Sequence, residues 1–272
     1  MGFQMNFHQS FAPETEALAQ LLRVASENPG YLTKEEISEI TMIPTGERSG
    51  KVVPHILYAQ AMGLLYVEKK VGKFSLTLTK VGEVISEEDP YLIEDITKWL
   101  CHYELVHKKS PALLWSYVFN YFIPRIGLEF NQSALEKAAL RNFDVVKINF
   151  SPFRSCFTAE RNLQIGIMEI IGEEYKMTPH LLNRNYRHFY GYMLLKNWEN
   201  GLGNQTEITF DQVVEDLGYG KPFLWNEKVI MDVLELLQDE GILEINRQLS
   251  PITIIKQVPA NYSLQKLYNY II

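Results

Sequence analysis

The feature that most constrains the fold is a change of apolar period at Gly63. Before it, apolar residues recur at helical spacing in three segments; Pro29-Gly30 ends the first, and Thr33 heads the second with a capping box, T-K-E-E. After it, LLYVEKK and KFSLTLT alternate apolar with polar residues on either side of Val71-Gly72, which is typical of a β-hairpin. Three helices and a hairpin predict a winged helix-turn-helix domain over residues 1–90.

The rest of the chain divides at Gly201. Residues 91–200 are almost wholly helical in pattern and rich in aromatic residues, so we expect a helical, basic-aromatic middle domain. A strand, a short helix, a longer helix and a two-strand ribbon then predict an acidic winged-helix-like module over residues 201–272. The predicted fold class is therefore mainly α with small β wings.

Charge is distributed unevenly along the chain. The formal net charge is −7, which argues against a protein that coats nucleic acid along its whole surface. Residues 1–90 carry 8 basic and 12 acidic side chains, residues 91–200 carry 13 and 11, and residues 201–272 carry 5 and 10. A surface for a polyanion must be local, and the acidic C-terminal module is expected to bind protein partners instead.

Several classes of protein are disfavoured by composition. No run approaches about 20 consecutive apolar residues, and the N-terminus lacks the basic residues of a secretory signal, so we expect no membrane partner. Cys101 and Cys156 have neither metal-ligand spacing nor a disulfide framework. Two buried thiols in a cytoplasmic protein are the simplest interpretation.

The stretch Gly46–Lys51 looks at first like a nucleotide-binding loop. Its spacing is one residue short, Val52 stands where a hydroxyl would bind magnesium, and the preceding segment is helical, so we reject this interpretation. The same residues suit the start of a helix that Ser49 caps. Arg48 and Lys51 would then lie where a helix N-terminus meets backbone phosphate.

Two stretches are candidates for DNA contact. In the helix that follows Gly50, one face carries Lys51, His55 and Tyr58. This face either meets DNA or is a solvated face whose histidine has its hydrogen bonds made within the protein. In the middle region, basic residues lie among aromatic ones, which suits single-stranded or distorted DNA; the alternative is a bundle helix with a snorkelling basic face. The residues predicted to contact DNA are Arg48, Ser49, Lys51, His55, Tyr58, Lys69, Lys70, Lys73, Arg154, Arg161, Arg184 and Arg187.

No pairing of a nucleophile with a base stands out. An acidic cluster that includes Asp89 and Asp95 offers oxygen ligands for a divalent metal, Mg²⁺ or Mn²⁺, in phosphodiester cleavage. The alternative is structural, because Asp89-Pro90 is also an ordinary helix break and acidic residues near a helix start complement its dipole.

Four stretches together resemble a bacterial family. They are Phe7-His8-Gln9-Ser10-Phe11, PTGERSGKVVPHILYAQAMGLL, LTLTKVGEVISEEDPYLIEDITKWLCHYEL and LLWSYVFNYF. In combination they are similar to the SspB-like components of DNA phosphorothioation and antiphage defence operons. The resemblance is dense over about residues 6–125 and thinner afterwards.

The resemblance implies a DNA-binding component of such a system, which nicks double-stranded DNA in support of sulfur insertion. It also implies protein partners from the same operon, and a homodimer is one state the sequence allows. A non-enzymatic winged-helix adaptor or transcriptional regulator, which binds partner proteins, remains the alternative. Net acidity and the missing active-site signature favour that alternative.

Overall fold

The structure is a computed structural model that describes residues 4–47, 49–248 and 250–271. The chain forms two compact units, residues 1–178 and residues 179–272. Within these described residues helices predominate and three small antiparallel sheets accompany them, so the predicted mainly α fold with small β elements is confirmed. No helix in the described part of the chain combines the length and apolarity needed to cross a membrane.

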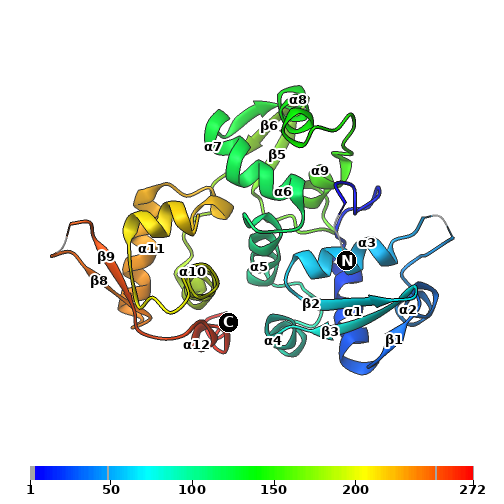
Figure 1. Cartoon of the computed structure of the whole chain (residues 1–272), viewed down its shortest axis with the longest axis horizontal. Helices are drawn as coiled ribbons and strands as arrows, with labels where there is room; N and C mark the ends of the chain where they lie inside the picture. Colours follow the sequence, from blue (N-terminus) through cyan, green and yellow to red (C-terminus); the bar gives the residue numbers. More distant parts are fainter. Residues whose placement is uncertain (1–3, 48, 249, 272) are drawn as a thin grey trace. The chain divides into compact units, whose positions relative to one another are not determined.

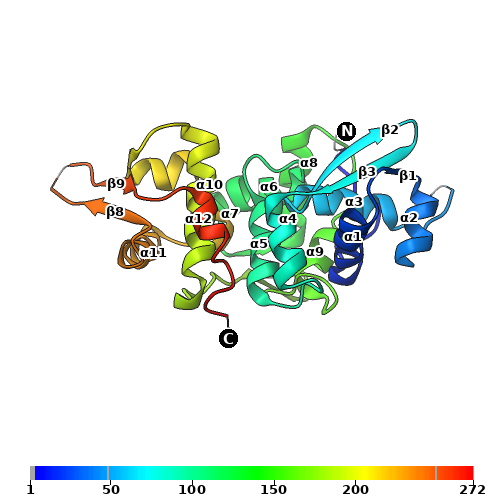
Figure 2. The ribbon, with the colours of Figure 1, turned by 90° about the horizontal axis from the view of Figure 1, so that it is seen from below.

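The first unit begins with a helical layer and a three-stranded sheet (Figure 1). Its elements are α1 (Thr15–Glu27), β1 (Tyr31–Leu32), α2 (Lys34–Thr41), α3 (Val52–Ala61), β2 (Leu65–Lys70), β3 (Lys73–Leu78) and α4 (Lys80–Glu88). The strands lie in the order β1-β3-β2, and α1 and α3 pack on one side of the β2–β3 hairpin (Figure 2). At the hairpin turn Val71 and Gly72 have φ of +47° and +79°, the combination that a tight two-residue turn requires.

A second sheet closes the first unit, in the region predicted to be almost wholly helical. Its elements are α5 (Asp95–Val106), α6 (Leu113–Tyr117), the π-helix η1 (Val118–Phe122), α7 (Ile123–Ile126), β4 (Glu129–Asn131), α8 (Gln132–Phe143), α9 (Ser151–Thr158), β5 (Met168–Ile171) and β6 (Glu174–Met177). The strand order is β4-β6-β5. The prediction missed this sheet because strands of three or four residues are too short for an alternating pattern to stand out.

The second unit contains the elements that the sequence predicted after Gly201, preceded by a long helix. They are the 3-10 helix η2 (Arg184–Tyr186), α10 (Arg187–Leu202), β7 (Glu207–Thr209), the π-helix η3 (Gln212–Asp216), the 3-10 helix η4 (Lys221–Phe223), α11 (Glu227–Asp239), β8 (Leu243–Asn246), β9 (Thr253–Lys256) and α12 (Ala260–Leu264). The strands lie in the order β7-β9-β8, and α12 packs along α10.

All three sheets are built in the same way. In each, a single strand is followed by helical segments and then by a hairpin, and the single strand pairs with the second strand of that hairpin. The same short supersecondary pattern therefore occurs three times in the part of the chain that the structure describes.

Aromatic side chains fill the core beside the first sheet. Tyr58 of α3 lies edge-on to Phe7 and to Trp115, with ring centroids 5.0 and 5.8 Å away. All three are buried, and Phe153 contacts Trp115 from α9. The N-terminal segment before α1 thus covers α3, which determines what α3 can do.

Candidate nucleic-acid interface

The helix predicted to read DNA is buried. Eight of the ten residues of α3 are buried, and Tyr58 is fully enclosed, with its hydroxyl donating to the Phe11 carbonyl at 3.1 Å. The predicted polar surface face of Lys51, His55 and Tyr58 is therefore wrong. The cause is the covering segment that includes Phe7 and Phe11, because it occupies the side of α3 that would otherwise be exposed.

His55 is a core histidine whose two ring nitrogens both form hydrogen bonds. Its Nδ1 donates to the Lys51 carbonyl at 2.7 Å, and its Nε2 accepts the backbone N–H of Glu14 at 3.1 Å. Burial lowers the pKa of His55 below its usual value, so the ring is neutral near pH 7. With both nitrogens engaged, His55 holds the start of α1 against α3 and has no donor for a base or a phosphate.

Lys51 and Arg161 share one carboxylate. Lys51 Nζ lies 2.8 and 2.9 Å from the two carboxylate oxygens of Glu14, and Arg161 Nε lies 3.5 Å from the same group. Lys51 and Glu14 are mostly buried, whereas the Arg161 side chain is 74% exposed. The charge of Lys51 is therefore neutralised inside the fold, and Arg161 is the member of this cluster that solvent reaches.

The turn before α3 is tight and forms no cap from a side chain. A Cβ at Gly50 would lie 2.6 Å from the Thr45 Cα, so only glycine fits there. The helix starts after Lys51 without a side-chain hydrogen bond, and Ser49 is exposed; the predicted Ser49 cap is wrong. Arg48 lies outside the described residues.

The tip of the β2–β3 hairpin carries exposed lysines. They are Lys69, Lys70 and Lys73, which we call the hairpin-tip lysines. Lys70 is 2.7 Å from the carboxylate of Glu68, and its hydrogen bond to that group raises the lysine pKa. Lys69 lies over the Phe74 ring at 5.2 Å. Three exposed ammonium groups thus gather around one turn.

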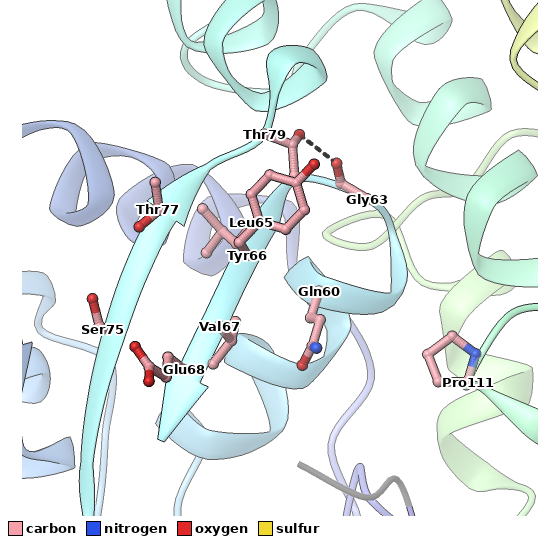
Figure 3. Close-up of a pocket in the computed structure, with 10 residues that line it drawn as sticks. All are labelled: Gln60, Gly63, Leu65, Tyr66, Val67, Glu68, Ser75, Thr77, Thr79 and Pro111. Atoms are coloured by element: carbon pink, nitrogen blue, oxygen red, sulfur yellow. Dashed lines mark hydrogen bonds between the residues drawn. The ribbon is translucent and has the colours of Figure 1, made fainter. Parts of the chain in front are cut away.

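A pocket lies beside the same hairpin (Figure 3). It has a volume of about 530 Å³ and is bordered by Gln60 and Pro111 across from strand β2. Its polar walls include Tyr66, Glu68 and Thr77, and among the described residues that line it there is no lysine, arginine or histidine. The pocket suits hydroxyl or amide groups, and its carboxylate disfavours a phosphate.

The remaining predicted arginines have partners in their own units. Arg154 donates to the Gln132 side chain at 2.8 Å in the first unit. In the second unit Arg184 lies 3.8 Å from Asp239, and Arg187 lies 3.1 Å from Glu240 and 4.2 Å from the centre of the Tyr270 ring. The arginines expected to form one basic surface thus belong to two separate units. In the second unit, carboxylates neutralise their charge.

The two acidic candidates do not form a metal centre. Asp89 is buried, and its carboxylate accepts the backbone N–H groups of Ile93 and Glu94, both at 3.0 Å. Asp95 is exposed and lies 3.5 Å from Lys98. Within residues 4–47, 49–248 and 250–271, no three histidine, cysteine or acidic side chains gather closely enough to hold a metal. Asp89 instead organises the turn that leads into α5.

Sequence reasoning missed an exposed aromatic residue with two basic neighbours. Tyr121 in η1 is 49% exposed, and Arg125 and Arg141 are both exposed. In the described part of the chain neither arginine forms an ion pair. Tyr121 belongs to the run VFNYF, whose other members are buried; the run looks like core throughout, so its pattern gave no signal.

Comparisons with known proteins agree on the fold. Two solved structures, described as "Magnesium ion-bound SspB crystal structure" and "SspB crystal structure", each match with a TM-score of 0.77 and 16% identity, covering 98% of this chain and 88% of theirs. The resemblance to SspB-like proteins is therefore confirmed at the level of the fold. No curated protein sequence matches. Residues 7–151, more than half of the chain, match the family model described as "Protein of unknown function (DUF4007)", and the chain belongs to that family.

Proposed function

We propose that this chain is a DNA-binding component of a bacterial DNA phosphorothioation or antiphage defence system. The observation that carries the proposal is the likeness to SspB over 98% of the chain. The chain would act beside other proteins of the same operon, with double-stranded DNA as its polymer ligand. The acidic α11 helix suits a protein partner better than DNA.

In this proposal the first sheet and its helices act as a winged helix-turn-helix in which the wing contacts DNA. The order α1-β1-α2-α3-β2-β3, with strand order β1-β3-β2, supports that topology. Because α3 is covered, base edges cannot be read from its buried face. The hairpin-tip lysines would instead approach backbone phosphate, which gives affinity without strong sequence preference.

Salt dependence measures this contact. Each phosphate neutralised by a lysine steepens the fall of log affinity with log salt by roughly 0.9 on duplex DNA. We therefore compare the wild type with the triple variant Lys69→Glu, Lys70→Glu, Lys73→Glu on a fluorescent duplex over a salt series. Loss of three contacts is expected to flatten the slope by roughly 2.7.

A matched control is Lys228→Glu in α11, an exposed lysine of the second unit outside the proposed surface. It should bind duplex DNA like the wild type. An unchanged slope in the triple variant would remove the hairpin from the proposal. No binding of the wild type to duplex DNA at low salt, even with the operon's other proteins present, would remove DNA binding itself.

A second candidate, a non-enzymatic adaptor that binds partner proteins, is favoured by one observation: the helix expected to read DNA is buried. Nicking belongs to the first proposal alone and stays a prediction. The test is conversion of supercoiled plasmid to open circles with purified protein and Mg²⁺ or Mn²⁺. Because Asp89 has a structural role, its alanine variant must be shown to be folded before any loss of activity is interpreted.

A further inference from the structure

The ring of Tyr121 is the exposed end of an aromatic stack. It lies nearly parallel to the Tyr117 ring, with centroids 6.4 Å apart and an interplanar angle of 19°. Tyr117 is 8% exposed and meets Phe143 of α8 edge-on at 5.4 Å. The buried Tyr117 ring holds Tyr121 from one side, so a further planar group can continue the stack on the other.

The backbone that carries this ring is held firmly. The side-chain nitrogen of Asn120 donates to the carbonyls of Val106 and Ser116, both at 2.8 Å, and Asn120 is itself buried. This inward asparagine lies within the π-helical turn, a feature often found at functional sites. Tyr121, the next residue, faces solvent on a fixed support, so stacking on it would need little ordering of the protein.

Two arginines lie near the stack: Arg125 is four residues after Tyr121, on the next helical turn, and Arg141 belongs to α8, whose Phe143 meets Tyr117. Burial raises the pKa of Tyr117, and Arg125 and Arg141 oppose that rise because both guanidinium groups act on the same ring. Arg125 lies in α7, and Arg141 lies in the last turn of α8, where its Nε donates to the Lys137 carbonyl. Unlike Lys51 and Arg187, these two cations have no carboxylate partner among the described residues.

We propose that Tyr121, Arg125 and Arg141 form a site for single-stranded nucleic acid, in which an unpaired base stacks on Tyr121 and the arginines contact the adjoining phosphates. A planar exposed ring with flanking cations fits that ligand, because every base has a face to stack and every linkage carries a charge. A base inside a duplex is already stacked on both sides. The site rests on the proposed function for its DNA source, since strand separation or nicking would supply unpaired bases.

The experiment measures binding of the full chain to a short fluorescein-labelled single-stranded DNA by anisotropy. Tyr121→Ala is expected to lower affinity by about 5-fold to 150-fold, the range for loss of one base stack, whereas Tyr121→Phe keeps the ring and should keep the affinity. The double variant Arg125→Glu, Arg141→Glu should also flatten the salt slope by roughly 1.4. Tyr91→Ala, which removes a tyrosine that is 72% exposed elsewhere in the unit, is the matched control.

The inference is overturned if the wild type binds no single strand at low salt, or if Tyr121→Ala binds like Tyr91→Ala. Thermal melting of each variant separates a lost site from a lost fold. If the alanine variant unfolds, the arginine double variant carries the test, and an unchanged salt slope in it overturns the site. The same assay with an RNA of the same sequence identifies the type of nucleic acid. Tighter binding of the RNA would show that RNA, and not DNA, is the ligand. The affinity for duplex DNA, measured in parallel, tests the contact of the hairpin-tip lysines. Duplex binding by the hairpin and single-strand binding at Tyr121 can therefore fail independently.

Discussion

Helix α3 and the β2–β3 hairpin belong to the same structural module, and the sequence predicted DNA contacts in both. The helix is buried under the N-terminal segment, and the lysine at its start is paired with Glu14. The hairpin tip keeps its three lysines at the surface. The difference teaches that helical spacing shows which residues share a face, but only the tertiary structure shows what covers that face.

The largest effect should come from the covered helix. Tyr58→Ala empties the centre of the cluster with Phe7 and Trp115, and we expect it to lower the free energy of unfolding by about 3–5 kcal/mol. Tyr58→Phe, which loses only the bond to the Phe11 carbonyl, should cost about 1 kcal/mol. Urea denaturation measures both values. A mild loss in Tyr58→Ala together with weakened duplex binding would reverse our assignment of α3.

The covering segment should make stability sensitive to acid. Burial lowers the pKa of His8 from 6.5 to about 4. Below pH 6.5 the unfolded state therefore binds a proton at His8 that the folded state does not bind. The contribution of neutral His8 to the free energy of unfolding is therefore fully present above pH 6.5 and is lost as pH falls toward 4. We expect wild type to lose about 2 kcal/mol more than His8→Gln between neutral pH and about pH 4.5. Equal losses in the two proteins would contradict a buried, neutral His8.

A smaller effect separates the paired lysine from the hairpin-tip lysines. Lys51→Ala leaves Glu14 without its main partner, and we expect about 1–2 kcal/mol of destabilisation with duplex affinity unchanged. Lys69→Ala should do the opposite, leaving stability intact and weakening duplex binding. Denaturation and anisotropy on the two variants give the comparison. If Lys51→Ala alone weakened duplex binding, the ion pair with Glu14 would have to open when DNA binds.

The smallest effect is expected at the turn. Ser49 is exposed and does not cap α3, so Ser49→Ala should change the free energy of unfolding by less than about 0.5 kcal/mol. A helix cap would cost about 1 kcal/mol when lost. Thr33→Ala is the matched positive control, because Thr33 accepts the N–H of Glu36 in a capping box. Equal destabilisation by the two substitutions would show that Ser49 also caps a helix.

Local patterns predicted the elements whose causes are local. The Thr33 capping box and the turn at Val71-Gly72 were predicted because each depends on residues a few positions apart. The outcome at α3 was not predictable in this way, since Phe7, Trp115 and Phe153 reach it from distant segments. Likewise the Glu14–Lys51–Arg161 cluster joins residues far apart in sequence, and charge counting treats its members as free.

The candidate site shows the same contrast between features with local causes and features with distant causes. The hairpin-tip lysines are exposed, as charged residues at a turn usually are, and their contact with DNA stays a prediction. For Asp89, the helix-break alternative described the residue correctly, since its carboxylate accepts two backbone N–H groups. Tyr121 lies in a run of otherwise buried residues that form one π-helical turn, and only its exposure in the folded structure distinguishes it from them.

Lysine footprinting distinguishes DNA contact through the hairpin from DNA contact through α3. The protein is acetylated briefly with and without saturating duplex DNA, and mass spectrometry measures the rate at each lysine. We predict slower modification of Lys69, Lys70 and Lys73 when DNA is bound, with no change at Lys51, whose ammonium group is held by Glu14. Protection at Lys51 with none at the hairpin tip would contradict the account.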